Sequence, residues 1–147
     1  MDRAKKASGM IAERKGNCAQ SVFTSFSDGL GLDEKAAFNI AQAFGGGMHI
    51  NSVCGAVTGA YMALGLANPV SKGNPRQSMD KTSALIAEFN RRFKELYGTL
   101  NCTELLGYDL TKPEEAAKAR EKGLFVTKCP EFVRDAVKIV ESLLQPE

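Results

Sequence analysis

The 147-residue chain has the size of a single domain and is long enough to bury a hydrophobic core without metal or disulfide cross-links. Its 19 Lys and Arg residues nearly balance its 17 Asp and Glu residues, which argues against the concentrated basic face of a nucleic-acid-binding protein. The polar N-terminus has no apolar run of the length that a signal peptide or a membrane span needs, so we expect a cytoplasmic protein with neither a nucleic-acid nor a membrane partner.

Apolar residues recur with the period of α-helices from one end of the chain to the other. The first amphipathic segment covers residues 2–14 and the second covers residues 18–27. Asp33 can accept the free N–H groups of a first helical turn, so it predicts the N-cap of a helix that runs to Phe44. The three glycines at positions 45–47 then end this helix.

The middle of the chain alternates between helices and strong loop signals. We expect a helix from about Ser52 to Leu66, followed by a loop at residues 68–77 that contains two prolines and a glycine. The segment 83–98 then places a stripe of apolar residues on one face of a helix, with Gly98 as its stop. This stripe consists of Leu85, Ile86, Phe89, Phe93, Leu96 and Tyr97.

Two further helices complete the chain. A polar helix follows Pro113 and ends at Gly123, and the last helix begins at Cys129-Pro130. The apolar stripe of this last helix consists of Phe132, Val133, Ala136, Val137, Val140, Leu143 and Leu144. The sequence therefore predicts an all-α fold: a compact single-domain bundle of about six to seven helices over residues 1–147.

The four cysteines are the strongest candidates for chemistry, because a cytoplasmic protein rarely keeps disulfides as permanent structure. No two of them form a CxxC pair, which disfavours zinc ribbons, thioredoxin-type motifs and clustered ferredoxin motifs. Each lies in the first turn of a predicted helix, where free N–H groups and the helix dipole lower the pKa of a thiol. These cysteines are Cys18, Cys54, Cys102 and Cys129.

The helix face on which each cysteine lies also agrees with one shared site. Each precedes an apolar residue by about one turn, and residues three or four apart share a helix face. Four helix starts could therefore bring four thiolates to one partly buried pocket. The alternative is that each cysteine is simply a small buried hydrophobic residue.

Glycines and the single histidine are further candidates. Gly46 and Gly47 in the segment GGGMH, together with Gly55 after Cys54, leave room for a cofactor to approach the backbone. His49 is a candidate proton donor or spare ligand. A glycine run after a helix is more often only a flexible break, and a lone histidine beside a loop usually has neither role.

The residues around the cysteines carry a family resemblance. The segments GNCAQSVF, CGAVTGAYMALGL, CTELLGYDL and CPEFV follow one another in the order found in the C_GCAxxG_C_C family, which is named for a redox role, and the likeness covers nearly the whole chain. Cys54, Gly55, Ala56 and Gly59 match its central element. The resemblance implies a cytoplasmic prokaryotic protein in which all four cysteines act as ligands. A similar cysteine domain accompanies the haem module of split-Soret cytochromes, where an iron–sulfur centre has been proposed, but this chain lacks the CxxCH of covalent haem.

Three functions compete at this point. The first is an iron–sulfur protein, with [2Fe–2S] as the preferred cluster, that serves electron transfer to an unidentified redox partner or redox sensing. The second is a thiol–disulfide oxidoreductase with Cys18 and Cys54 as the catalytic pair. The third is a structural zinc or interaction module. A homodimer is a further possibility, because the small residues of segment 54–65 can support close packing between chains.

Overall fold

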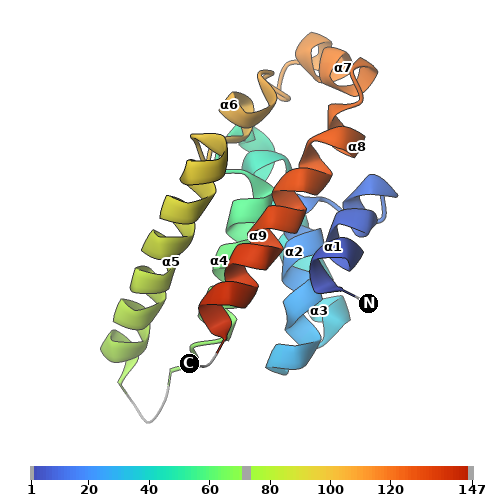
Figure 1. The fold of residues 1–147 in the computed structure, drawn as a ribbon. Helices are drawn as coiled ribbons and strands as arrows, with labels where there is room; N and C mark the ends of the chain where they lie inside the picture. The colour runs from blue at the N-terminus through green and yellow to red at the C-terminus, as the bar shows by residue number, and fades with distance from the viewer. Residues whose placement is uncertain (1, 71–73, 146–147) are drawn as a thin grey trace.

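Helices account for all of the regular structure in residues 2–70 and 74–145, the part of the chain that the computed structural model describes (Figure 1). The predicted all-α fold is confirmed. These residues form nine α-helices, more than the six to seven expected, and two of the nine are short: α6 (Cys102–Leu106) has five residues and α8 (Leu124–Thr127) has four. Within the same residues, no helix combines the length and the apolar character needed to cross a membrane.

The first three helices begin at capping residues. In α1 (Arg3–Ala12), Asp2 accepts a hydrogen bond from the backbone N–H of Ala4 at 2.8 Å. In α3 (Glu34–Ala41), Asp33 accepts one from Ala36 at 3.0 Å, as predicted. The helix α2 (Cys18–Ser27) has the predicted bounds. These ends follow from local chemistry, because a side-chain oxygen satisfies N–H groups that the helix leaves free.

The helices α4 (Gly55–Leu66) and α5 (Pro75–Tyr97) depart from the predicted boundaries. The α4 helix begins three residues later than expected. The α5 helix begins inside the segment predicted as a loop, because Pro75 occupies its first turn, which needs no N–H donor. Of the predicted loop, residues 71–73 lie outside the described residues.

The predicted stripe on α5 is wrong at one position. Phe89 and Phe93 are buried and Tyr97 packs against the core, whereas 58% of Leu96 is exposed. Positions 89, 93 and 97 are four residues apart and form one line along the helix, and Leu96 lies to the side of that line. Because α5 contacts the bundle through a narrow stripe against α4 and α9 (Cys129–Leu144), this offset exposes Leu96.

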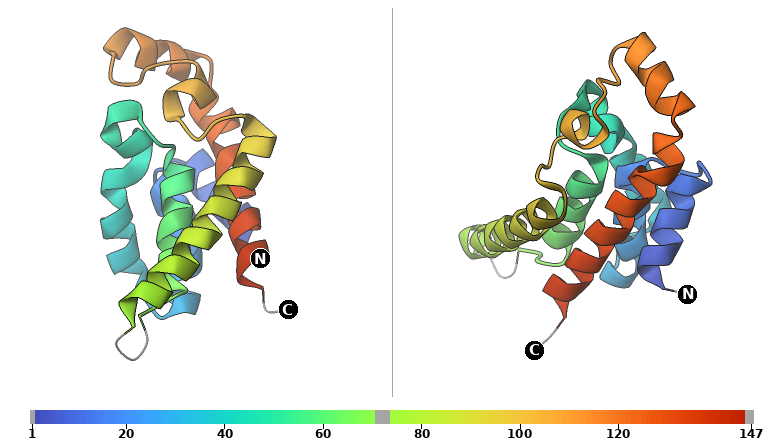
Figure 2. Two further views of the ribbon diagram at one scale, coloured as in Figure 1. Left: turned by 90° about the vertical axis from the view of Figure 1, so that its left-hand side faces the viewer. Right: turned by 45° about the horizontal axis from the view of Figure 1, so that its top comes forward.

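The core forms around α2, which is buried along nearly its whole length. It packs most extensively against α4, while α9 packs against α1, α2, α4 and α5. The polar side chains inside α2 have hydrogen-bond partners: Thr24 Oγ1 donates to the Gln20 carbonyl of the same helix at 2.7 Å, and the Gln20 amide donates to the Phe38 carbonyl of α3 at 3.0 Å. Figure 2 shows α7 (Pro113–Glu121) at the end of the bundle where α6 and α8 also lie.

Candidate functional site

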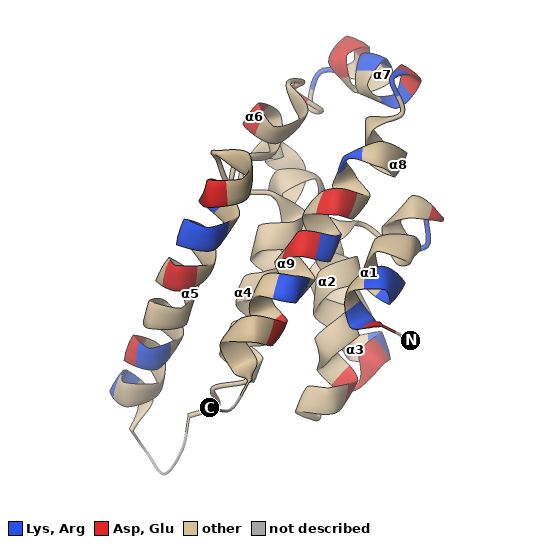
Figure 3. Ribbon diagram, viewed as in Figure 1, with Lys and Arg blue, Asp and Glu red and all other residues tan. Residues whose placement is uncertain are grey.

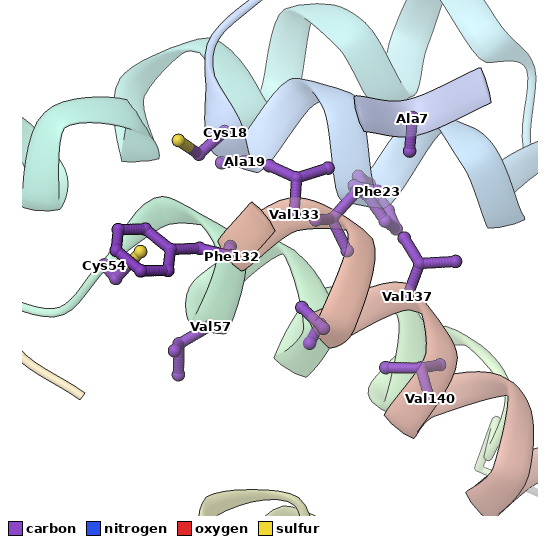
Figure 4. Close-up of a cluster of buried hydrophobic side chains, with 14 of the residues drawn as sticks. Ala7, Cys18, Ala19, Phe23, Cys54, Val57, Phe132, Val133, Val137 and Val140 are labelled. Carbon is purple, nitrogen blue, oxygen red and sulfur yellow. The ribbon is translucent and has the colours of Figure 1, made fainter. Parts of the chain in front are cut away.

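The four cysteines lie around one cavity at this end of the bundle. The cavity has a volume of about 210 Å³. Between 4% and 9% of each cysteine is exposed, so all four are buried. Figure 4 shows Cys18 and Cys54 beside Phe132, at one end of the core that Val133, Val137 and Val140 continue along α9. The structure thus brings together the four cysteines that the sequence singled out.

Cys18 is fixed by the start of α2. Asn17 Oδ1 accepts a 2.9 Å hydrogen bond from the Gln20 N–H, and Gln20 Oε1 accepts one of the same length from the Asn17 N–H. This reciprocal capping box sets Cys18 as the first residue of the helix. The Asn17 amide also donates to the Gln42 carbonyl at 3.0 Å, which ties this helix start to the end of α3.

Cys54 and Cys102 are held together by the backbone. The Cys54 N–H donates to the Leu100 carbonyl at 2.8 Å, and the Cys102 N–H donates to the Ser52 carbonyl at 2.7 Å. These bonds flank an isolated antiparallel bridge between Val53 and Asn101. Two segments 48 positions apart in the chain, 102 minus 54, therefore present their cysteines side by side.

The bridge also corrects the predicted start of α4. Neither Asn51 nor Ser52 caps the helix, because the Asn51 amide donates to Thr103 and to the Tyr108 carbonyl and Ser52 pairs with Cys102. Cys54 itself occupies the N-cap position. It still lies at a helix start, as the sequence predicts.

Cys129 lies at a junction between two helices. The Lys128 backbone is helical and its N–H donates to the Leu124 carbonyl at 2.8 Å, so α8 leads almost directly into α9. Pro130 follows in the first turn of α9. The N-terminus of α9 is consequently less open than the starts of α2 and α6.

Glycines allow the cysteine segments to approach one another. A side chain at Gly55 would place its Cβ 3.0 Å from the Cβ of Cys18, and a side chain at Gly47 would place its Cβ 3.0 Å from the Cβ of Cys102. Gly47 also has a φ of 61°, which disfavours other residues. Gly46 and Gly55 line the cavity, whereas Gly47 lies against Ser52 and Cys102.

His49 is placed differently from the other candidate residues. It is exposed, its Nε2 lies 3.0 Å from the Gln42 carbonyl, and it lines a separate open hollow instead of the cysteine cavity. The structure therefore does not bring His49 to the cysteines.

The sequence predicts only some of the apolar residues that line the cavity. Leu105, Leu106 and Phe132 point inward as expected from their spacing to Cys102 and Cys129. Ile11, Leu110 and Phe125 also line the cavity, although each stands in a largely polar or turn-rich segment. Their signal is that they are apolar residues close to predicted helix ends or turns.

The cysteines differ in acidity in the metal-free protein. Hydrogen bonds with Cys129 and Cys54, together with burial, raise the pKa of Cys18 well above its ordinary value. Burial, with a smaller effect of the neighbouring thiols, raises the pKa of Cys102 to about 12. The prediction of a lowered pKa is wrong for these two residues, because burial and thiol neighbours outweigh the helix start.

Cys54 behaves in the opposite way. A hydrogen bond from Cys18 lowers the pKa of Cys54 and outweighs its burial, with further support from the N–H groups of Ala56 and Val57. These N–H groups face the sulfur without forming a regular cap hydrogen bond. Cys54 is therefore the cysteine whose surroundings favour a thiolate, and Cys18 is its adjacent thiol.

The side chains are not gathered around a single point. Across residues 2–70 and 74–145, no group of three or more His, Cys, Asp or Glu side chains is arranged to hold one metal ion. A single zinc ion would require each sulfur at about 2.3 Å from it. The four cysteines instead surround a cavity with mostly apolar walls.

Comparisons with known proteins identify one relationship. The model of a family described as "Putative redox-active protein (C_GCAxxG_C_C)" matches residues 16–143, a range that includes all four cysteines. No curated protein and no solved structure matches the chain.

Proposed function

The chain belongs to the C_GCAxxG_C_C family, and on this premise we propose that its four cysteines hold an iron–sulfur cluster for electron transfer or redox sensing. One observation carries the proposal. Four buried thiols from four different helices line the same cavity of about 210 Å³. The ligands of this cluster are Cys18, Cys54, Cys102 and Cys129.

The donor set fits the cluster chemically. Iron–sulfur clusters are held by cysteine thiolates, and four is the number that both [2Fe–2S] and [4Fe–4S] clusters take. Cysteines spaced around a cavity favour a group of several atoms over a single ion. Ligation requires the four side chains to turn their sulfurs into the cavity. We keep [2Fe–2S] as the preferred type, and such a cluster supplies one-electron transfer when it is bound.

The rest of the cavity has two roles. Leu105, Leu106 and Phe132 make its wall apolar and keep water from the sulfurs. The N–H groups of Ala56 and Val57 face Cys54 and offset negative charge there. These features suit electron transfer to a redox partner protein or redox sensing.

Purification without oxygen tests this proposal. We expect iron and acid-labile sulfide in the protein, together with visible absorption that is bleached by dithionite. Because the ligands meet only in the folded chain, the midpoint of thermal unfolding should fall when the metal is removed. Protein without iron, sulfide and visible absorption would contradict the proposal, and one equivalent of zinc would instead favour a structural site.

A second candidate function rests on the contact between two of the cysteines. The hydrogen bond with Cys18 lowers the pKa of Cys54, whereas hydrogen bonds with Cys129 first and Cys54 second raise the pKa of Cys18. A thiolate next to a thiol is the starting state of a dithiol that closes to a disulfide. Cys18 and Cys54 would then form the catalytic pair.

Thiol counting separates this candidate from the first. After mild oxidation of the metal-free protein with oxidised glutathione, a redox pair predicts that two of the four thiols disappear and that peptide mapping links Cys18 to Cys54. Reduction with dithiothreitol should restore the count. Four unchanged thiols, or a disulfide that involves other cysteines, would exclude this pair.

A further inference from the structure

An open hollow of about 600 Å³ adjoins the cysteine cavity. It lies between the end of α1, the start of α2, α3 and the segment where α7 leads into α8. Ile11, Asn17 and Phe125 line both the hollow and the cavity, so these three side chains form the wall between them. The volume is within the range of about 300–1,000 Å³ that is typical of small-molecule sites.

The charges around this hollow have one sign. Arg14, Lys15 and Arg120 line it, and among the described residues no Asp or Glu does. Lys15 has a partner outside the lining, Glu13, at 3.5 Å, and both of these side chains are largely exposed. Figure 3 shows Lys and Arg at the end of α1 and, interspersed with Asp and Glu, on α7. Three cations in one concave surface favour an anionic ligand.

The backbone at Arg14 adopts the left-handed conformation at the end of α1. Arg14 has a φ of 58° in the motif that closes α1, where its N–H donates to the Ile11 carbonyl at 3.0 Å and the Lys15 N–H donates to the Met10 carbonyl at 2.9 Å. Glycine is the usual residue at this position, because a side chain there is unfavourable. The arginine side chain is exposed at the hollow.

A second strained residue faces the same hollow. His49 has a φ of 61°. Residues other than glycine in this conformation are uncommon and gather at functional sites. Of the four such residues in the described chain, two line this hollow.

The floor of the hollow is apolar. Ile11, Phe38 and Phe125 line it beside the cations. Aromatic and aliphatic surface beside a few charged groups is the usual composition of a site for a ring-bearing molecule. We propose that this basic hollow binds a small anionic molecule with an apolar ring system, next to the cysteine cavity. The proposal does not depend on whether the cysteines hold a cluster.

A pair of fluorescent probes tests this site. Anilinonaphthalene sulfonate carries both an anionic group and a ring system, whereas phenylnaphthylamine has a similar ring system without the charge. We expect the full-length protein to bind the sulfonate with one-to-one stoichiometry, and the Arg120→Gln variant to bind it about tenfold more weakly. The control variant is Arg76→Gln, which removes an exposed arginine that pairs with Asp80 on α5, outside the hollow.

The Arg14→Gly variant separates binding from folding. Glycine relieves the strained φ, so the midpoint of thermal unfolding should rise by about 2–5 °C, while sulfonate binding weakens about tenfold. Binding that is unchanged in Arg14→Gly and Arg120→Gln would overturn the proposal, as would equally tight binding of the neutral probe. Because the readout is probe binding, this outcome is independent of iron content.

Discussion

Replacing any one of the four cysteines with alanine is expected to abolish the stable binding of iron and sulfide. Alanine offers no donor atom, and the cavity provides no other thiol that could replace the missing ligand. Because each helix contributes one ligand, the loss should be equally severe for Cys18, Cys54, Cys102 and Cys129. The measurements are iron and sulfide per chain and the visible absorption of protein handled without oxygen.

A matched control distinguishes the loss of a ligand from damage to the cavity. Leu105 lines the same cavity without a donor atom. The Leu105→Ala variant should therefore lose some stability but keep its iron. Circular dichroism should show the helices in every variant. A cysteine variant that retains the iron content of the unmodified protein would show that this cysteine is not a ligand.

Local chemistry made much of the fold predictable. Asp33 caps α3 as predicted, and α2 has the predicted bounds 18–27. Both predictions succeed because helix ends depend on hydrogen bonds within a few residues. Cys18, Cys102 and Cys129 are the first residues of their helices, and Cys54 is the N-cap of its own. The prediction that four cysteines lie at helix starts is therefore confirmed.

Other features required tertiary contacts and could not be predicted. The register of Cys54 against Cys102 depends on backbone bonds between segments that are far apart in the sequence. The raised pKa of Cys18 depends on which thiols become its neighbours. The placement of His49 depends on the left-handed turns after Gly45, which direct it to the hollow. Neither the helical period of the apolar residues nor the sequence spacing of the cysteines carries information on such contacts.

The Gly59→Ala variant is expected to destabilise the protein by about 1–3 kcal/mol, although alanine favours helices more than glycine does. A Cβ at position 59 would lie 2.8 Å from the Ala19 carbonyl oxygen and 3.0 Å from the Cβ of Val22. Since α2 and α4 pack more extensively than any other pair, neither helix can withdraw without loosening the core. The free energy of unfolding from urea titrations measures the effect.

Gly65 provides the comparison within the same helix. A Cβ there would have no atom within 4 Å, so Gly65→Ala should stabilise the protein by about 0.5–1 kcal/mol through helix propensity alone. If Gly59→Ala were as stable as Gly65→Ala, the close approach of α2 and α4 would be wrong. The contact also matters for the site, because Ala19 follows Cys18 directly and any shift of α2 moves that sulfur. A destabilised Gly59→Ala protein should therefore also bind less iron, which connects the small residues of α4 to the chemistry of the cavity.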